Sequence, residues 1–275
     1  MLNPHSSLDL LREWAAWEHG KAPFLLEADR PVLTSQRSAR SLVTVRSWSA
    51  AHRADDFGAP GDGRLHLGLL PQPFCGDLRR PSVYVLLLNP GLGPSDYFGE
   101  YKVKRYRHAL VATLKQDFQP GSVPFLFLDP QFAWHGGFGW WHGKLAGVIG
   151  RLARVWSVPF AAARMRLGNE LASIELFPYH SASFRDGGGW IRQLYSVMLA
   201  RAFVKDVVIP RVKRGEAIAI VTRHTKVWDL PDHPRIVRYS ATEVRAAHLS
   251  PDSRGGHAIL SHLCERERVS RSHVD

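Results

Sequence analysis

Short apolar runs separated by long amphipathic segments constrain the fold of this chain more than any other feature. The runs are too short for helices, and the segments between them repeat their apolar residues at helical spacing. The expected strands are Val83–Leu88, Phe125–Leu128, Ile174–Phe177, Ala217–Val221 and Ile236–Tyr239. Because buried parallel strands need helices on both faces, we predict an α/β fold, a three-layer α/β/α sandwich with a central, mostly parallel sheet of four or five strands.

The intervening helices are expected at residues 101–117, 143–156, 160–169 and 190–209. In the last of them one apolar stripe is formed by Ile191, Leu194, Met198 and Ala202. The start of the chain predicts an amphipathic helix that follows Ser6, and Leu42–Val45 predicts an edge strand.

The length and composition favour one large domain over two small ones. The chain has 275 residues, of which 45% are apolar, enough for a sizeable core. We expect residues 1–64 to form a helix and loop extension packed on the core. Residues 65–265 are expected to form the main domain, and the charged residues 266–275 are expected to form a frayed tail.

The charge balance favours partners that are rich in phosphate. Lys and Arg outnumber Asp and Glu by 36 to 25, for a net charge of +11 at pH 7 and a pI near 10.0. Nucleic acid is the leading candidate, and an ordinary basic enzyme is the alternative. With only Cys75 and Cys264, a single chain can build neither a disulfide framework nor a four-thiolate metal site. With no long apolar stretch, we expect a cytoplasmic monomer that does not enter membranes.

Two motifs follow expected strands. Asn89-Pro90-Gly91 comes directly after the run 83–88, and His248-Leu249-Ser250-Pro251-Asp252-Ser253 follows the last run. Ligands of parallel sheets bind beyond the carboxyl ends of the strands, so the two motifs are expected to converge there with Glu175. Together they resemble the first and last active-site motifs of the uracil-DNA glycosylase superfamily, most closely its single-strand-selective monofunctional branch. The resemblance covers about residues 65–265.

The resemblance implies hydrolysis of the bond between a base and its deoxyribose, with no cofactor or metal. Asn89 would hold the attacking water and His248 would hydrogen-bond the departing base. Leu88, Pro90 and Gly91 would line the base pocket, where the turn lets the backbone approach a flipped nucleotide. The alternative for His248 is a loop histidine without a catalytic role.

Glu175 stands where the superfamily usually has a base-reading asparagine. An asparagine amide both donates and accepts, which suits uracil, whereas an ionised glutamate only accepts, which suits the amino group of cytosine. This favours a modified cytosine, such as the glucosylated hydroxymethylcytosine of some phage DNA. An alternative of equal weight is that Glu175 pairs with an arginine and reads nothing.

Aromatic residues supply further candidates for DNA contact. Phe98 resembles the ring that stacks on the flipped base, although core packing is an equally good interpretation. Residues 132–142 gather aromatic rings among glycines in an expected loop, which would suit a wide pocket or a DNA-facing surface. Packing of a helix onto the sheet is the favoured interpretation of this run.

Basic residues supply phosphate contacts in the same hypothesis. Lys102, Lys104 and Arg105 follow the first motif together with Arg107, interleaved with two tyrosines, and the alternative is a solvated helix face. In the last motif, DNA contacts are assigned to Ser250, Pro251, Ser253 and Arg254. Of these, Arg254 or Ser253 would fill the gap left by the extruded nucleotide.

The sequence departs from the family pattern at Leu87, Glu175 and Leu249, where glycine, asparagine and proline are usual. These departures affect the substrate more than the fold or the hydrolytic class. The leading hypothesis is a monofunctional glycosylase acting in defence against phage or in DNA repair. The alternatives are a uracil-DNA glycosylase of base excision repair and a DNA-binding module without activity. The turn at Gly91–Gly93 lacks both common nucleotide-binding patterns, so a nucleotide-binding protein is disfavoured.

Overall fold

The computed structural model describes residues 9–35, 42–53, 61–184, 189–240 and 248–272. By their internal contacts the residues form two compact units that interleave along the chain. Unit 1 comprises Met1–Phe74, Leu87–Gln119 and Ile174–Asp206; unit 2 comprises Cys75–Leu86, Pro120–Ser173 and Val207–Asp275. Residues 1–64, the expected extension, all belong to unit 1, and the division into an extension and a catalytic domain stays a prediction.

A five-stranded sheet carries the buried apolar runs, and most of its residues belong to unit 2. Its strand order is β3-β5-β4-β6-β7. The strands are β3 (Phe74–Cys75), β4 (Val83–Leu87), β5 (Leu171–Glu175), β6 (Ile218–Val221) and β7 (Ile236–Arg238). β4 pairs with β6 and β6 with β7, both in parallel. The predicted α/β class, with helices alternating with parallel strands, is confirmed.

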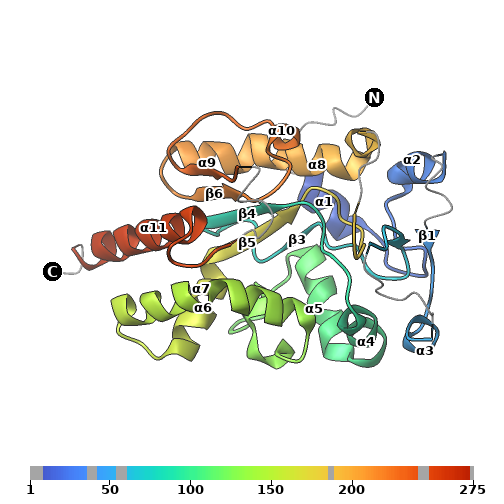
Figure 1. Cartoon of the computed structure of the whole chain (residues 1–275), viewed down its shortest axis with the longest axis horizontal. Helices are drawn as coiled ribbons and strands as arrows, with labels where there is room; N and C mark the ends of the chain where they lie inside the picture. Colours follow the sequence, from blue (N-terminus) through green and yellow to red (C-terminus); the bar gives the residue numbers. More distant parts are fainter. Residues whose placement is uncertain (1–8, 36–41, 54–60, 185–188, 241–247, 273–275) are drawn as a thin grey trace. The chain divides into compact units, whose positions relative to one another are not determined.

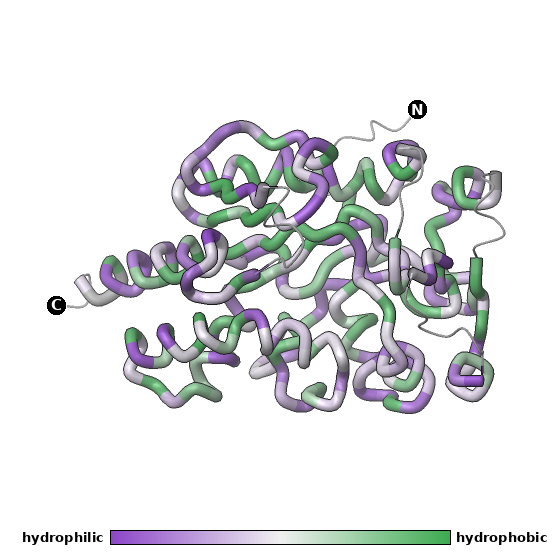
Figure 2. Tube along the Cα trace, viewed as in Figure 1, coloured by the Kyte–Doolittle hydropathy of each residue, from purple (hydrophilic) through white to green (hydrophobic). Residues whose placement is uncertain are grey.

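The helices of unit 2 cover this sheet. Figure 1 shows α9 (Ile209–Lys213) on one side of it, with α6 (Gly136–Trp156) and α7 (Phe160–Glu170) on the other. α10 (Thr225–Trp228) connects β6 to β7, and α11 (Arg254–Arg271) packs against α6, β6 and β7. Apolar residues concentrate along the strands (Figure 2). Because α11 extends to Arg271, residues 266–271 are helical, where the sequence predicted a frayed tail.

Unit 1 gathers the helices from the first part of the chain. α1 (Asp9–Ala16) packs against α5 (Lys104–Lys115) and α8 (Tyr195–Phe203). The remaining elements of its first 74 residues are η1 (Glu27–Asp29), α2 (Arg30–Ser35), β1 (Leu42–Val43), α3 (Trp48–Ala51) and β2 (Leu65–His66). β1 pairs with β2 in parallel, so the expected strand near residue 42 is present.

A buried carboxyl group ties three segments of unit 1 together. Asp29 accepts hydrogen bonds from the Tyr179 hydroxyl at 2.7 Å and from the Ser196 amide at 3.1 Å. The Tyr179 oxygen in turn accepts from the amide of Leu26 at 3.1 Å. Burial raises the pKa of Asp29 above its ordinary value. The N-terminal residues are thus joined to the segment that follows β5.

The expected strand at Phe125–Leu128 was wrong. Leu126–Leu128 is a 3-10 helix, η3, followed by a second one, η4 (Pro130–Phe132). The run is buried, as a central strand would be, but it is flanked by Pro124 and Pro130, which lack the N–H groups that a sheet requires. Apolar character alone did not distinguish the two structures.

Several helix boundaries also differ from the expected ones. The expected helix at 101–117 is two helices, α4 (Pro94–Lys102) and α5, and α6 begins at Gly136 rather than at 143. The aromatic run 132–142 is thus largely helical rather than a loop. The expected helix at 190–209 consists of η5 (Trp190–Gln193), α8, a π-helix η6 (Val204–Val208) and the start of α9. Pro210 lies near the start of α9, and because it has no N–H group it cannot continue the hydrogen bonds of α8.

Among the described helices, none is by itself long and apolar enough to cross a membrane; α6 and α7 satisfy the length and composition test only as a pair, bent by 104°.

Two glycine substitutions test how tightly α11 packs on the loop that precedes it. A Cβ atom at Gly256 would lie 1.9 Å from the carbonyl oxygen of Ser250, whereas one at Gly150, inside α6, would have no atom within 4 Å. We expect Gly256→Ala to lower the free energy of unfolding by about 1–3 kcal/mol through this overlap. Gly150→Ala should raise it by about 0.5–1 kcal/mol, because alanine favours the helix. Urea denaturation monitored by circular dichroism measures both, and a Gly256→Ala protein as stable as the wild type would contradict this packing.

Candidate functional site

The Asn-Pro-Gly motif and the segment after β5 lie side by side in unit 1. At the end of β4, the carbonyl of Leu87 accepts from the amide of Leu176 at 3.2 Å. The next carbonyl, that of Leu88, accepts from the amide of Phe177 at 2.8 Å. The backbone pairing of β4 and β5 therefore continues to the residue before Asn89. The sequence expected Asn89 and Glu175 at the same end of the sheet, and these hydrogen bonds place the residues that follow the two strands side by side.

The side chain of Asn89 is held by the backbone of the segment after β5. Its amide nitrogen donates to the carbonyl of Ser181 at 3.2 Å, and the residue is partly buried. This bond orients the amide group and leaves its oxygen to accept a hydrogen bond from another molecule. The geometry suits a residue that orients a water molecule.

His180 fixes the turn that follows Asn89. Its Nδ1 lies 2.9 Å from the carbonyl oxygen of Gly91, and its Nε2 lies 3.2 Å from that of Leu70. Gly91 has φ of +73°, a conformation that favours glycine. Two residues after Gly91, the backbone amide of Gly93 donates to the carboxylate of Asp96 at 2.6 Å. The turn is therefore held both from the segment after β5 and from α4.

The charge state of His180 is set by its burial. Burial lowers the pKa of His180 below its ordinary 6.5, while Asp96 and the carbonyl groups of Gly91 and Leu70 oppose the shift. A neutral imidazole has one N–H, so it can donate to only one of the two carbonyl oxygens at a time. The sequence analysis missed His180; its only signal there was a histidine following the Pro178-Tyr179 pair after a strand.

A second buried group lies behind this turn. Both carboxyl oxygens of Glu100 accept from the amide of Leu70, at 3.1 and 2.9 Å, and Arg107 lies 3.5 Å away. Burial raises the pKa of Glu100 well above its ordinary value. The backbone N–H of Leu70 thus faces Glu100 and its carbonyl faces His180. Both side chains therefore contact the backbone of the same residue. The sequence analysis did not identify Glu100.

Glu175 is the last residue of β5 and its side chain is buried, with the residue only 7% exposed. Its amide donates to the carbonyl of Pro73 at 2.9 Å. β5 is the sheet neighbour of β4, whose end leads to Asn89. Glu175 is therefore at the carboxyl end of its strand, where we expected it. Its role in reading a base stays a prediction.

The aromatic and basic candidates near α4 are on the surface, with one exception. Phe98 is 39% exposed and contacts Trp48 edge-to-face at 5.7 Å, so it is not a core residue. The basic side chains Lys102, Lys104 and Arg105 are exposed. Of the interleaved tyrosines, Tyr106 is fully buried, whereas Tyr101 is partly exposed and its hydroxyl donates to the carbonyl of Gly68 at 2.6 Å.

The last motif forms a loop in unit 2 that leads into α11. His248 is exposed, and its carbonyl accepts a hydrogen bond from the Tyr239 hydroxyl, while the next residue, Leu249, is buried. Ser253 caps α11 by accepting from the amide of Gly256 at 3.0 Å. The loop is therefore anchored at Leu249 and at the start of α11, and His248 stands at its exposed end.

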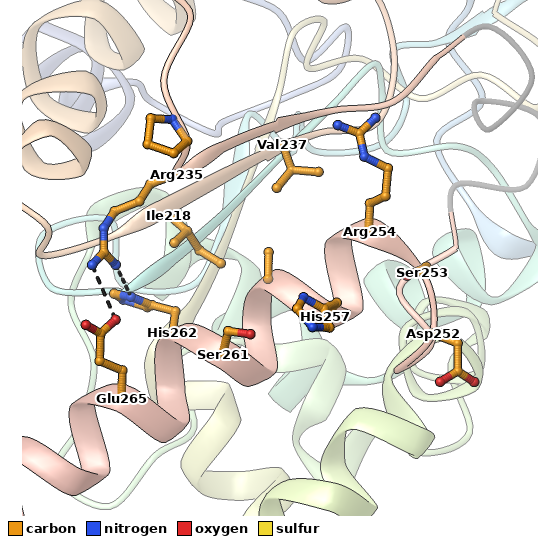
Figure 3. Close-up of a pocket in the computed structure, with 12 residues that line it drawn as sticks. Ile218, Arg235, Val237, Asp252, Ser253, Arg254, His257, Ser261, His262 and Glu265 are labelled. Atoms are coloured by element: carbon orange, nitrogen blue, oxygen red, sulfur yellow. Dashed lines mark hydrogen bonds and ion pairs between the residues drawn. The ribbon is translucent and has the colours of Figure 1, made fainter.

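Next to this loop lies an open groove of about 560 Å³ between α11 and β7 (Figure 3). Ser253 and Arg254 lie at one end, where Arg254 donates to the carbonyl of Arg238 at 2.8 Å. At the other end Arg235 contacts Nδ1 of His262 at 3.0 Å. Arg254 is thus hydrogen-bonded to its own chain, and its role as a wedge in DNA stays a prediction.

Asn89 belongs to unit 1 and His248 to unit 2. The meeting of these two side chains at one nucleoside therefore stays a prediction. Within unit 1, the ends of β4 and β5 carry Asn89, Glu175 and His180. Within unit 2, one loop and the first residue of α11 carry the remaining candidates, which are His248, Ser250, Pro251, Ser253 and Arg254.

Neither a family model nor a curated protein nor a solved structure matches this chain. Among the described residues, no cluster of three or more histidine, cysteine, aspartate or glutamate side chains is placed to hold a metal ion.

The buried His180 generates a prediction about stability at low pH. The lowered pKa keeps the ring neutral in the folded chain, whereas the unfolded chain takes up a proton near 6.5. Between these two pKa values the unfolded state binds more protons, so stability falls as the pH falls below about 6.5. We expect His180→Gln to show a smaller loss of unfolding free energy between about pH 7.5 and about pH 5.5.

Urea denaturation at a series of pH values measures this difference. The same substitution at His262, whose pKa is also lowered by burial and by Arg235, serves as a comparison. The two reductions should add, because the two rings share no hydrogen-bond partner: His180 contacts Gly91 and Leu70, and His262 contacts Arg235. A His180→Gln protein with the pH dependence of the wild type would contradict the assignment.

Proposed function

We propose that this protein is a monofunctional DNA glycosylase that flips a modified base out of DNA and hydrolyses its N-glycosidic bond. The observation that carries the proposal is the hydrogen bond from the Asn89 amide to Ser181, 3.2 Å long. It supports the assignment because an asparagine that only terminated a strand would not need its side chain oriented by the segment that follows Glu175 and β5. The resemblance of the two motifs to the uracil-DNA glycosylase superfamily adds to it.

The reaction needs an oriented water and a stabilised leaving group. The water oxygen attacks C1′ of the deoxyribose while the bond from C1′ to the base nitrogen breaks, and the electron pair of that bond departs with the base. The attacking water loses a proton to solvent and the departing anionic base takes one up from solvent, so the products are the neutral free base and an abasic site. An amide is too weak a base to take that proton, so Asn89 orients the water through its oxygen, and His248 stabilises the negative charge on the base.

The contacts around the turn explain how such a site would be kept rigid. His180 and Asp96 hold the backbone at Gly91 and Gly93. A small displacement of an orienting group reduces rate strongly, so a fixed turn is what this mechanism requires. Glu100, which holds Leu70, supports the same arrangement from behind.

Glu175 directs the proposal toward a modified cytosine. A carboxylate at the end of β5 can accept from the exocyclic amino group of cytosine, and it has no proton to donate to uracil O4. A glucosylated hydroxymethylcytosine of phage DNA fits this hypothesis, which would make the protein a defence enzyme. A uracil-DNA glycosylase of base excision repair is the alternative, and a DNA-binding module without activity is a second one.

Substitution of the two proposed catalytic residues tests the activity. With a panel of oligonucleotides carrying modified cytosines, uracil, hypoxanthine or xanthine, the wild type should release a modified cytosine and leave an abasic site that alkali cleaves. We expect Asn89→Ala and His248→Ala each to lower the rate about 10²- to 10³-fold, because each removes one group that acts in the transition state.

Asn169→Ala is the matched control for this test. Asn169 is an exposed asparagine whose amide also donates to a backbone carbonyl, that of Met165 at 2.9 Å. It should retain wild-type activity. If no base is released from any oligonucleotide, or if Asn89→Ala and His248→Ala leave release unchanged, the glycosylase proposal fails; unchanged DNA binding would then favour the module without activity.

The identity of residue 175 tests the choice of base. We expect Glu175→Asn to raise the release of uracil relative to modified cytosine by about tenfold or more, because the amide can donate to O4 and accept from N3–H. Glu175→Gln keeps the length of the side chain and should lower release of the modified cytosine without the same gain for uracil. Release assays on both substrates measure the ratio. An unchanged ratio in both variants would mean that Glu175 does not read the base.

A further inference from the structure

One face of α6 carries an unusual sequence of side chains from its start to its middle. Trp140, Lys144, Gly147 and Arg151 follow one another at intervals of four, three and four residues, which places them along one face of the helix. We call these four residues the α6 stripe. All of them belong to unit 2, as does the loop 248–253.

The second half of the α6 stripe contacts the loop that contains His248. A Cβ atom at Gly147 would lie 2.7 Å from the ring of Pro251, so the absence of a side chain there lets the loop approach the helix. Arg151 forms an ion pair with Asp252 at 2.9 Å. The α6 stripe is therefore continuous with the loop that would bind DNA.

The first half of the α6 stripe combines an exposed aromatic ring with positive charge. Trp140 is 43% exposed, and the Lys144 ammonium lies 4.5 Å from the centre of its ring. Burial and the nearby Arg223 lower the pKa of Lys144 from its ordinary value. A cation close to this exposed indole, with Arg151 as a second cation further along the α6 stripe, would favour a negatively charged ligand that also offers a flat ring.

We propose that the α6 stripe binds the single-stranded DNA that flanks the target nucleotide, with one base stacked on Trp140 and an adjacent phosphate on Lys144. This rests on the proposed function only in taking the loop 248–253 to face DNA. Charge complementarity and continuity with that loop favour nucleic acid over an apolar protein surface, which would have to bury both cations. Lys144 moves from the ring to the phosphate as the base takes its place.

Binding of a labelled single-stranded oligonucleotide without any modified base tests the proposal independently of catalysis. We expect Trp140→Ala to weaken binding about tenfold and Trp140→Phe, which keeps a flat ring, to weaken it much less. The matched control is Trp134→Ala, because Trp134 is 38% exposed in the same unit but lies outside the α6 stripe. Fluorescence anisotropy gives the affinities, and circular dichroism verifies that each variant is folded.

A series of oligonucleotides in which one nucleotide at a time lacks its base identifies the stacking position. The wild type should bind weakly when the missing base is the one that stacks, and Trp140→Ala should show no further weakening at that position. Heparin, which has charge but no bases, should bind the wild type and Trp140→Ala equally. A tenfold loss on heparin, an equal loss in Trp134→Ala, or unchanged DNA binding in Trp140→Ala would overturn the proposal.

The outcome separates the two proposals. If the wild type releases no base from any substrate but Trp140→Ala still weakens oligonucleotide binding, the α6 stripe stands and the glycosylase activity does not. If the wild type releases a base and Trp140→Ala binds and acts like the wild type, the activity stands and the α6 stripe does not.

Discussion

The hydrogen bonds of His180 are the interaction on which the candidate site depends. One buried imidazole lies between the carbonyl oxygens of Gly91 and Leu70, 2.9 and 3.2 Å from its two nitrogens, and donates to one of them at a time, so it lies between the turn after β4 and the segment before β3. Ser181, the residue after His180, accepts a hydrogen bond at its carbonyl oxygen from the side-chain amide of Asn89. Because moving a buried ring that donates to the backbone would leave that donor unpaired, His180 restrains the turn.

The loop around His248 is fixed by different means. Leu249 is buried, and α11 approaches the carbonyl of Ser250 so closely that only glycine fits at position 256. Pro251 packs where Gly147 of α6 has no side chain. Close packing against two helices thus replaces the hydrogen-bonded frame used at the Asn-Pro-Gly turn. Each of the two motifs is thus held by contacts within its own unit.

The reasoning from the sequence worked where the periodicity of apolar residues was clear. It predicted β4, β6 and β7 within a residue or so at each end, and it predicted the α/β class. It failed at Phe125–Leu128, because two prolines remove donors from an apolar run, and at residues 132–142, where glycines suggested a loop but the chain forms the start of α6. His180 and Glu100 were missed because neither lies in a recognisable motif; only their contacts with Leu70 distinguish them.

The sequence by itself determined the alternation of helices with parallel strands, the basic charge, and the position of Asn89 after a strand, because these depend on the order of apolar, polar and turn-forming residues along the chain. The structure decided that β5 ends at Glu175, whereas the expected strand was Ile174–Phe177. Only the tertiary structure decided which buried side chains hold the turn and that Trp140 and Lys144 lie in line with the loop at Pro251. Such contacts join residues far apart in the chain. The strength of these contacts depends on distance, and the charge of a group such as His180 depends on its burial. A local sequence pattern contains neither.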